Sequence, residues 1–343
     1  MKNNLSSGNE KRIKRLGQFF TTRPEYILQG LSIPNNANII EPFAGNGDLV
    51  VWLSKFKFQR IECFDLISKH SWITCRDTLL NAPCYSNKYI VTNPPFVSKS
   101  NSFDKMIFNK YKANNLYKCF ILSFLNSNCL GGILILPANF WFSHSDLKLR
   151  QLFLKKYKIM RINFFEEQIF DNVRVVICSF DFRLKKSENN VTNIFFFPSN
   201  KFFSVDINSG MLVDIAPSFI PCKSIKLANA STNTAKILNS TSIVLQTIDS
   251  SPSNQIRLSL VNDLPTTSKA CVRISTNIFL SLDQQHKVVD NFNVLLKDLR
   301  NKHSSLLFPY FLGCKYMGFN RKRIPISAAF RIINSILRDL NFV

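Results

Sequence analysis

The chain has 343 residues, 45% of them hydrophobic, which predicts a globular protein of two domains and excludes a disordered or fibrous class. No apolar stretch approaches the ~20 residues of a membrane span, and the N-terminus lacks the apolar centre of a signal peptide. A cytoplasmic protein without a membrane partner is therefore expected. The net charge of +22 is spread over both halves and favours nucleic acid as a partner, although a basic surface also serves solubility or membrane attraction.

Cysteine and histidine usage gives no sign of a metal site or a disulfide framework. The nine cysteines are odd in number, scattered and without a C-x-x-C pair, and the four histidines are equally dispersed. We therefore expect no bound metal and a reducing compartment.

From residue 38 onward, short apolar runs alternate with longer mixed segments, which is the pattern of an α/β sheet. Strands are predicted in six of the apolar runs: residues 38–40, 60–64, 73–75, 88–92, 131–137 and 173–180. Helices are predicted over residues 49–56 and 117–126.

The unusual residues of this half follow the apolar runs, at the carboxyl ends of predicted strands, where open α/β sheets bind ligands. Gly45 and Gly47 lie in the first strand-to-helix turn, where a backbone without side chains lets a ligand approach closely. Asp65 and Asp77 follow the second and third strands. A carboxylate there can bind ribose hydroxyls or an adenine amino group, but both residues can equally be helix caps or solvated loop residues.

The tetrapeptide Asn93-Pro94-Pro95-Phe96 follows the fourth predicted strand. Its prolines fix φ and remove two backbone donors, so the chain leaves the strand as a rigid turn. The side-chain oxygen of Asn93 and the carbonyl of Pro94 can then accept both protons of a planar amino group, while Phe96 offers a stacking platform. Because Asn-Pro and Pro-Pro are also ordinary turn signals, the catalytic interpretation depends on the surrounding motifs.

The second half carries no chemical motif, only Ser/Thr/Asn-rich stretches between short apolar runs. Two basic clusters, residues 297–303 and 321–323, are candidates for phosphate contacts or for a solvated face, and phosphate is favoured for the second. Residues 328–340 are predicted to form a helix that packs one apolar face, made of Phe330, Ile333, Ile336, Leu337 and Leu340, against its domain.

Taken in order, these motifs resemble S-adenosylmethionine-dependent adenine-N6 DNA methyltransferases in which the catalytic domain precedes a target-recognition domain. The resemblance covers roughly the first 185 residues. Residues 15–21 are similar to the family's N-terminal cofactor motif, with Thr22 standing where members often have proline. Residues 41–48 resemble the glycine-rich loop, residues 132–139 a later strand motif, and residues 170–176 the segment before a final hairpin.

The resemblance implies an α/β fold with a Rossmann-like methyltransferase sheet in residues 1–186 and a smaller C-terminal recognition domain in residues 187–343. It implies that Glu41 faces the amino end of S-adenosylmethionine, Asp65 its ribose and Asp77 its adenine. The implied cofactor-binding residues are Gly17, Gln18, Phe19, Phe20, Thr21, Glu41, Pro42, Phe43, Ala44, Gly45, Asn46, Gly47, Asp65, Asp77 and Asn93, and the implied catalytic residues are Asn93, Pro94, Pro95 and Phe96.

The implied reaction is direct methyl transfer to the N6 amino group of an adenine flipped out of double-stranded DNA and stacked on Phe96. Candidates for a second aromatic contact with the base are Phe140, Trp141, Phe165 and Phe170, each of which is more often a core residue. A monomer is expected, with a cognate restriction endonuclease acting on the same site as a further partner.

Three other interpretations share parts of this pattern. Ribosomal RNA adenine dimethyltransferases also carry a Gly-Gln-aromatic segment, but generally have Asn-Leu-Pro or Asn-Ile-Pro at the catalytic motif. Protein-glutamine and rRNA guanine methyltransferases share Asn-Pro-Pro-aromatic, but the segment Gly17 to Phe20 and the long basic second half disfavour them. A nucleic-acid-binding protein that has lost catalysis is disfavoured by the intact Glu41, Asp65 and Asn93.

Overall fold

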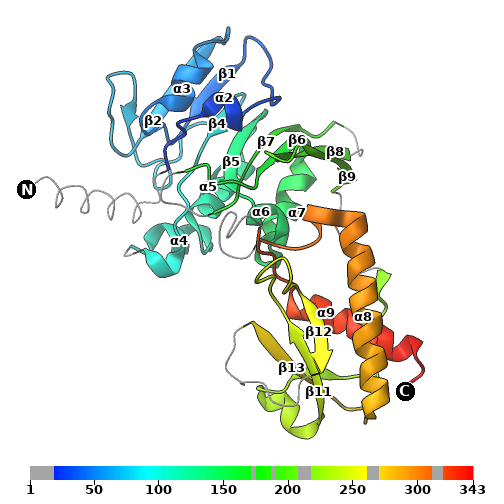
Figure 1. Cartoon of the computed structure of the whole chain (residues 1–343). Coiled ribbons are helices and arrows are strands. Elements are labelled where there is room, and N and C mark those ends of the chain that lie inside the picture. The colour runs from blue at the N-terminus through cyan, green and yellow to red at the C-terminus, as the bar shows by residue number, and fades with distance from the viewer. Residues whose placement is uncertain are drawn as a thin grey trace, which may run out of the picture. The chain divides into compact units, whose positions relative to one another are not determined.

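The computed structural model of the chain describes residues 19–102, 104–170, 175–186, 191–207, 218–260, 270–310 and 320–342. The chain divides into two compact units, Met1–Gly210 and Met211–Val343 (Figure 1). The sequence predicts the division at residues 186 and 187, whereas the strands of residues 191–206 pair within the sheet of the first unit.

The strands described in the first unit form one nine-stranded sheet of order β3-β2-β1-β4-β5-β7-β6-β8-β9. Their bounds are Asn38–Glu41 (β1), Arg60–Asp65 (β2), Thr74–Cys75 (β3), Tyr89–Thr92 (β4), Gly131–Pro137 (β5), Tyr157–Phe165 (β6), Ile177–Leu184 (β7), Val191–Phe197 (β8) and Lys201–Asp206 (β9). β1 to β5 are parallel, and β7 runs antiparallel between β5 and β6. This confirms the predicted α/β class with a Rossmann-like sheet.

Helices lie between β1 and β2, between β4 and β5, and between β5 and β6, whereas β2, β3 and β4 are joined by turns and loops. Their bounds are Pro24–Ile27 (α2), Asp48–Leu53 (α3), Met106–Tyr111 (α4), Leu116–Leu125 (α5), Asn139–Phe142 (α6) and Leu147–Lys156 (α7), with 3-10 turns at Lys99–Asn101 (η1) and His144–Asp146 (η2). The two predicted helices are present as α3 and α5, and α3 ends three residues before the expected end at residue 56.

The centre of the sheet is buried on both faces. Residues 131–136 of β5 are all buried, as are Ile90 and Val91 of β4, which explains their near-continuous apolar sequence. The carboxyl ends of β1 and β4 are adjacent, because β1 pairs with β2 on one side and with β4 on the other. Strand order reverses there, which makes it the topological switch point of the sheet.

Strand β6 was not predicted from the sequence. Helix α7 ends at Lys156 and β6 begins at Tyr157, without a glycine or proline between them. A register shift between Ile159 and Arg161 also interrupts the alternation of buried and exposed residues. Both signals that normally mark a helix-to-strand boundary are therefore missing.

The second unit contains a four-stranded antiparallel sheet of order β10-β13-β11-β12 in its described residues. Its elements are Leu227–Asn229 (β10), Asn239–Gln246 (β11), Arg257–Leu260 (β12), Cys271–Thr276 (β13), Leu282–His303 (α8) and Ile326–Asp339 (α9), with 3-10 turns at Asn233–Ile237 (η4) and Ser304–Leu306 (η5). A capping box formed by Ser281 and Gln284 begins the 22-residue helix α8.

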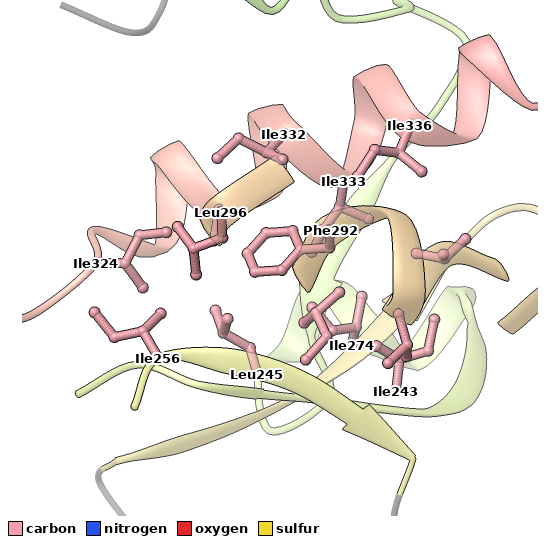
Figure 2. Close-up of a cluster of buried hydrophobic side chains, with 14 of the residues drawn as sticks. Ile243, Leu245, Ile256, Ile274, Phe292, Leu296, Ile324, Ile332, Ile333 and Ile336 are labelled. Carbon is pink, nitrogen blue, oxygen red and sulfur yellow. The ribbon is translucent and has the colours of Figure 1, made fainter. Parts of the chain in front are cut away.

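Figure 2 shows the core of the second unit, in which the ring of Phe292 from α8 lies between the sheet and α9. Leu245 and Ile274 approach it from the strands, and Ile333 approaches it from α9. The predicted C-terminal helix is confirmed as α9, with Ile333, Ile336 and Leu337 buried.

The two basic clusters of this unit are tied into its structure. Arg300 pairs with the buried Asp249 at 2.7 Å. Lys322 is buried, with its Nζ 3.2 Å from the centroid of the Tyr310 ring. These two side chains are anchored in the unit, while phosphate contact by their neighbours stays a prediction.

In the ranges that the structure describes, no helix combines the length and the apolar character needed to cross a membrane.

The core position of Phe292 gives a stability prediction. Phe292→Ala should lower the free energy of unfolding of the second unit by about 3–5 kcal/mol, because it leaves a cavity between the sheet and α9. Val294→Ala is the matched control on the same helix, since Val294 is 62% exposed, and should change stability by less than about 0.5 kcal/mol. Chemical denaturation of the full chain measures both, and equal effects would contradict the assignment.

Candidate active site

The carboxyl ends of β1 and β4 are joined by side chains. Thr92, the last residue of β4, donates its hydroxyl hydrogen bond to Oε1 of Glu41, the last residue of β1, and the Phe43 backbone N–H donates to the same oxygen at 2.9 Å. Asn93 follows Thr92 directly, so this hydrogen bond positions the predicted catalytic tetrapeptide beside the predicted cofactor loop.

Glu41 is fully buried, and its second carboxylate oxygen, Oε2, has no hydrogen-bond partner. Burial raises the pKa of Glu41 to about 8, although the hydrogen bonds from Thr92 and Phe43 lower it. A buried carboxyl oxygen without a partner is costly in either protonation state, which makes this oxygen a candidate for binding a cationic ligand that would favour the ionised form.

The glycine loop is held by Asp65. The Gly45 backbone N–H donates to Asp65 Oδ2 at 2.8 Å, and the Ile67 N–H donates to Oδ1 at 3.0 Å. Gly45 has a φ of +55°, and a Cβ there would lie 3.2 Å from the ring of Phe20. Glycine is therefore favoured both by the backbone conformation and by the close approach of Phe20.

The next residues of the loop, Asn46 and Gly47, are covered by the segment after β2. Lys69 donates to the side chain of Asn46, and the His70 ring contacts the Asn46 carbonyl at 3.0 Å. A Cβ on Gly47, whose φ is +87°, would overlap the ring of Trp72. This half of the predicted cofactor loop therefore faces protein.

Asp77 caps the backbone turn that follows it, which is one of the roles that the sequence left open. Its Oδ1 accepts hydrogen bonds from the N–H groups of Leu79 and Leu80, at 3.0 and 2.9 Å. The same residue also lines the cavity described below, so the capping role does not exclude a contact with a ligand.

The side-chain amide of Asn93 is oriented by the segment before α2. Its nitrogen donates to the Phe19 carbonyl at 2.6 Å and to Thr21 Oγ1 at 3.2 Å. A carbonyl can only accept, so the nitrogen must face Phe19. The side-chain oxygen of Asn93 is consequently left buried and without a partner.

A cavity of about 290 Å³ lies over these residues. Eight of the predicted site residues line it: Phe19, Phe20, Phe43, Gly45, Asp65, Asp77, Asn93 and Pro95. Thr21, Glu41, Pro42, Ala44, Pro94 and Phe96 do not line it; Phe96 is partly buried and the other five are buried. A further wall, not expected from the sequence, is formed by Ser102, Asp104, Ile107 and Phe108.

Three phenylalanine rings meet next to Asn93. Phe19 stacks on Phe96 with centroids 5.5 Å apart and a 28° angle between the ring planes, and on Phe170 at 6.0 Å and 18°. Phe96 is therefore not an open platform, because Phe19 occupies one of its neighbouring ring positions.

These contacts separate the four aromatic candidates. Phe140 and Trp141 pack against Phe180, and Phe165 packs against Phe197, as core residues with no more than 1% exposure. Of the four, only Phe170 has a ring contact with the Phe19 and Phe96 pair.

Predicted site residues Gly17 and Gln18, and the motif residues 171–174, lie outside the described residues.

A buried polar cluster behind Phe96 was also not predicted. Tyr117 contacts Phe96 edge-on at 6.5 Å and donates its hydroxyl hydrogen bond to Asp146, which also pairs with Lys118. Arg150, fully buried, donates to the carbonyls of Phe140 and Ser143. The sequence carries no signal for this cluster, since its members come from α5, η2 and α7.

Comparison with known sequences agrees with this arrangement. Residues 86–170, which include the Asn93 tetrapeptide and Phe170, match the family described as Eco57I restriction-modification methylase. The matched segment begins just before β4 and contains one side of the cavity.

Two curated relatives, the type II methyltransferases M.HincII and M.HindII of Haemophilus influenzae, are each 26% identical over 224 residues. The alignment with each covers 59% of this chain, and 44% and 42% of M.HincII and M.HindII respectively, so the chain spans less than half the length of these relatives. Among solved structures, the chain is similar to a modification subunit of a putative type I restriction enzyme from Vibrio vulnificus. The match covers 74% of this chain and 61% of that subunit, at 12% sequence identity and a TM-score of 0.43.

The raised pKa of Glu41 predicts a pH-dependent stability without ligand. The folded protein binds this proton more tightly than the unfolded chain, whose pKa is near 4.5, so the contribution is complete below pH 4.5 and is lost as pH rises to about 8. Glu41→Gln cannot ionise, so its stability relative to the parent should rise by about 1.4 kcal/mol per pH unit between pH 6 and 8.

Thermal or chemical denaturation at several pH values measures this difference. Glu25→Gln is the control, because the Glu25 side chain is 61% exposed and its pKa is lowered. Its stability relative to the parent should stay constant from pH 6 to 8, and a similarly constant difference for Glu41→Gln would contradict the pKa assignment.

Proposed function

We propose that the protein is a site-specific DNA methyltransferase that transfers a methyl group from S-adenosylmethionine to the N6 amino group of a flipped adenine. The observation that carries this proposal is the orientation of Asn93, whose nitrogen is held by Phe19 and Thr21 while its oxygen stays buried and unpaired. The restriction-modification methylase match of residues 86–170 supports the same reaction class.

The geometry at Asn93 suits an amino group as the acceptor of the methyl. An exocyclic NH2 is a poor nucleophile, because its lone pair is conjugated with the ring. Accepting one of its protons at Asn93 Oδ1 and the other at the Pro94 carbonyl favours a pyramidal nitrogen with its lone pair exposed. The oxygen of Asn93 needs no reorganisation for this role, since its amide is already fixed.

The residues of the cavity also fit the cofactor. Glu41 Oε2 is an orphaned acceptor suited to an ammonium group, while Asp65 and Asp77 offer carboxylates and Phe20 and Phe43 offer apolar surface. The cofactor supplies a methyl group bound to a positively charged sulfur. The chain supplies its orientation and a largely apolar, water-excluding surface around it.

The target base is proposed to stack on Phe96 in the ring position that Phe19 now holds, with Phe170 as a second aromatic contact. This follows from the stacking of Phe19 on both rings. Base entry then requires the side-chain ring of Phe19 to move, while its backbone carbonyl keeps the hydrogen bond that orients Asn93.

The second unit is proposed as the target-recognition domain. The sequence predicts that this domain begins at residue 187, whereas the second compact unit begins at residue 211. The net charge of +22 supports a duplex DNA partner, and the relation to restriction-modification enzymes supports a cognate endonuclease acting on the same site. A monomer in the cytoplasm is the proposed working state.

Transfer of label from radioactive S-adenosylmethionine to duplex DNA, ribosomal RNA or a peptide release factor tests the choice of substrate. Label in DNA, located on N6 of adenine after digestion to nucleosides, is the expected result. Label only in RNA or protein would refute DNA as the substrate, and no binding of the cofactor in calorimetry would leave a nucleic-acid-binding protein without this catalysis.

Asn93→Ala removes the proposed acceptor and should lower the transfer rate by a factor of about 100 or more. Binding of S-adenosylmethionine, measured by calorimetry, should survive. Asn81→Ala is the control, because Asn81 has an exposed side chain and should keep the parental rate. Substantial activity in Asn93→Ala would show that the acceptor role is misassigned.

Phe170→Ala removes the proposed second aromatic contact and should raise the KM for DNA roughly tenfold, as expected for the loss of one base–aromatic stacking contact. Cofactor affinity should not change. Phe202→Ala, at a ring that is 54% exposed, serves as the control and should leave KM at the parental value.

Phe19→Ala in the same assay distinguishes two roles for this ring. If the base replaces Phe19, the variant should bind cofactor normally and have an unchanged or lower KM for DNA. A loss of cofactor affinity alone would instead support the role that the family resemblance implies, in which Phe19 covers the methionine part.

A further inference from the structure

A second cavity, of about 670 Å³, lies beside the candidate active site, and the buried Phe108 lines both. Four lysines line this second cavity, which we call the lysine groove: Lys99, Lys112, Lys118 and Lys148. We propose that the lysine groove binds the phosphodiester backbone of duplex DNA next to the flipped base. This inference rests on the proposed function for the identity of the polymer.

The topology brings these lysines to the edge of the sheet that carries Asn93. Lys99 lies in η1, six residues after Asn93. Lys118 lies in the first turn of α5, which leads into β5, and Lys148 lies in the first turn of α7, which follows the end of β5. η1 and α5 follow β4 along the chain, and α7 follows β5. An element that follows a parallel strand begins at the carboxyl edge of the sheet.

The groove keeps a positive charge, because the acid that pairs with one of its lysines is buried. Asp146 is 2% exposed and pairs with Lys118, and it accepts from Tyr117 as well. None of the lining residues is acidic. Lys112 and Lys148 are exposed, so their charges face solvent and a ligand.

The remaining lining suits a sugar–phosphate chain. Leu149 and Leu152 contribute apolar surface, and the Leu152 side chain is 54% exposed. Asn114 and Ser145 contribute exposed hydrogen-bonding groups among the lysines. Phosphate oxygens need cations and donors, whereas deoxyribose presents carbon and ether atoms, and the groove offers both kinds of contact.

The position of the groove indicates which part of the DNA it would contact. The segment that follows the Asn93 tetrapeptide forms part of the groove wall. Its backbone is hydrogen-bonded to the segment before α5: the Lys99 N–H donates to the Asn114 carbonyl at 2.8 Å, and the Leu116 N–H donates to the Val97 carbonyl at 3.0 Å. The groove is therefore separated from Asn93 and Phe96 by only a few residues. Phosphates close to the flipped nucleotide are the ones within its reach.

The test is the salt dependence of duplex DNA binding by the full chain, measured by fluorescence anisotropy over a series of KCl concentrations. The double variant Lys112→Gln/Lys148→Gln should bind about tenfold more weakly at low salt. Its plot of log K against log[KCl] should be flatter by about 1.8, because each lost phosphate contact removes about 0.9 from the slope. Calorimetry with S-adenosylmethionine should give the parental affinity, which shows that the variant is folded.

The matched control is Lys57→Gln/Lys186→Gln, which removes the same charge from two exposed lysines at the opposite, amino edge of the sheet. Its slope should equal that of the parent. Equal effects of the two pairs, or no effect of the groove pair, would overturn the proposal, and so would binding of RNA but not of duplex DNA by the parent.

Because this readout is binding, it does not depend on methyl transfer. If the chain bound DNA without methylating it, the proposed function would fail while the change in slope of the groove variant would remain. If it methylated DNA and the groove pair behaved as the control pair does, the groove proposal alone would fail.

Discussion

The hydrogen bond between Thr92 and Glu41 is the interaction on which the site depends. It joins the ends of β1 and β4 at the point where strand order reverses, and so sets Asn93 beside the glycine loop. Two acceptors within a few residues of this bond, Glu41 Oε2 and Asn93 Oδ1, are buried without partners. Each such atom costs roughly 1–3 kcal/mol, which a fold tolerates mainly where a ligand is to complete the hydrogen bonding.

The ends of the central strands could be predicted because burial on both faces produces apolar runs that stop abruptly. Glu41, Asp65 and Asn93 each follow such a run, and the structure brings them to one edge of the sheet. The same reasoning failed at β6, where α7 passes directly into the strand. It also placed the division between the halves before β8, although Phe196 and its neighbours pair with β6.

Contacts between segments far apart in sequence could not be predicted. Phe19 resembles a cofactor-covering residue in the sequence and lines the cavity, but the stacking of its ring on Phe96 and the hydrogen bond from Asn93 to its carbonyl could not be foreseen. Lys118 looks like one more surface lysine, but it is buried against Asp146. Sequence gives the residue types near a strand end, whereas the choice of partner for each side chain is decided by tertiary packing.

The direct passage from α7 into β6 has a consequence for the entropy of binding. Helix α7 carries Lys148 and is fixed at both ends, by the sheet after Lys156 and by the buried Arg150 near its start. A wall held in this way loses little freedom when a ligand arrives, so little of the interaction energy is spent on ordering it. The absence of a loop between α7 and β6 made β6 hard to predict from the sequence. The same direct connection pre-organises this wall of the groove.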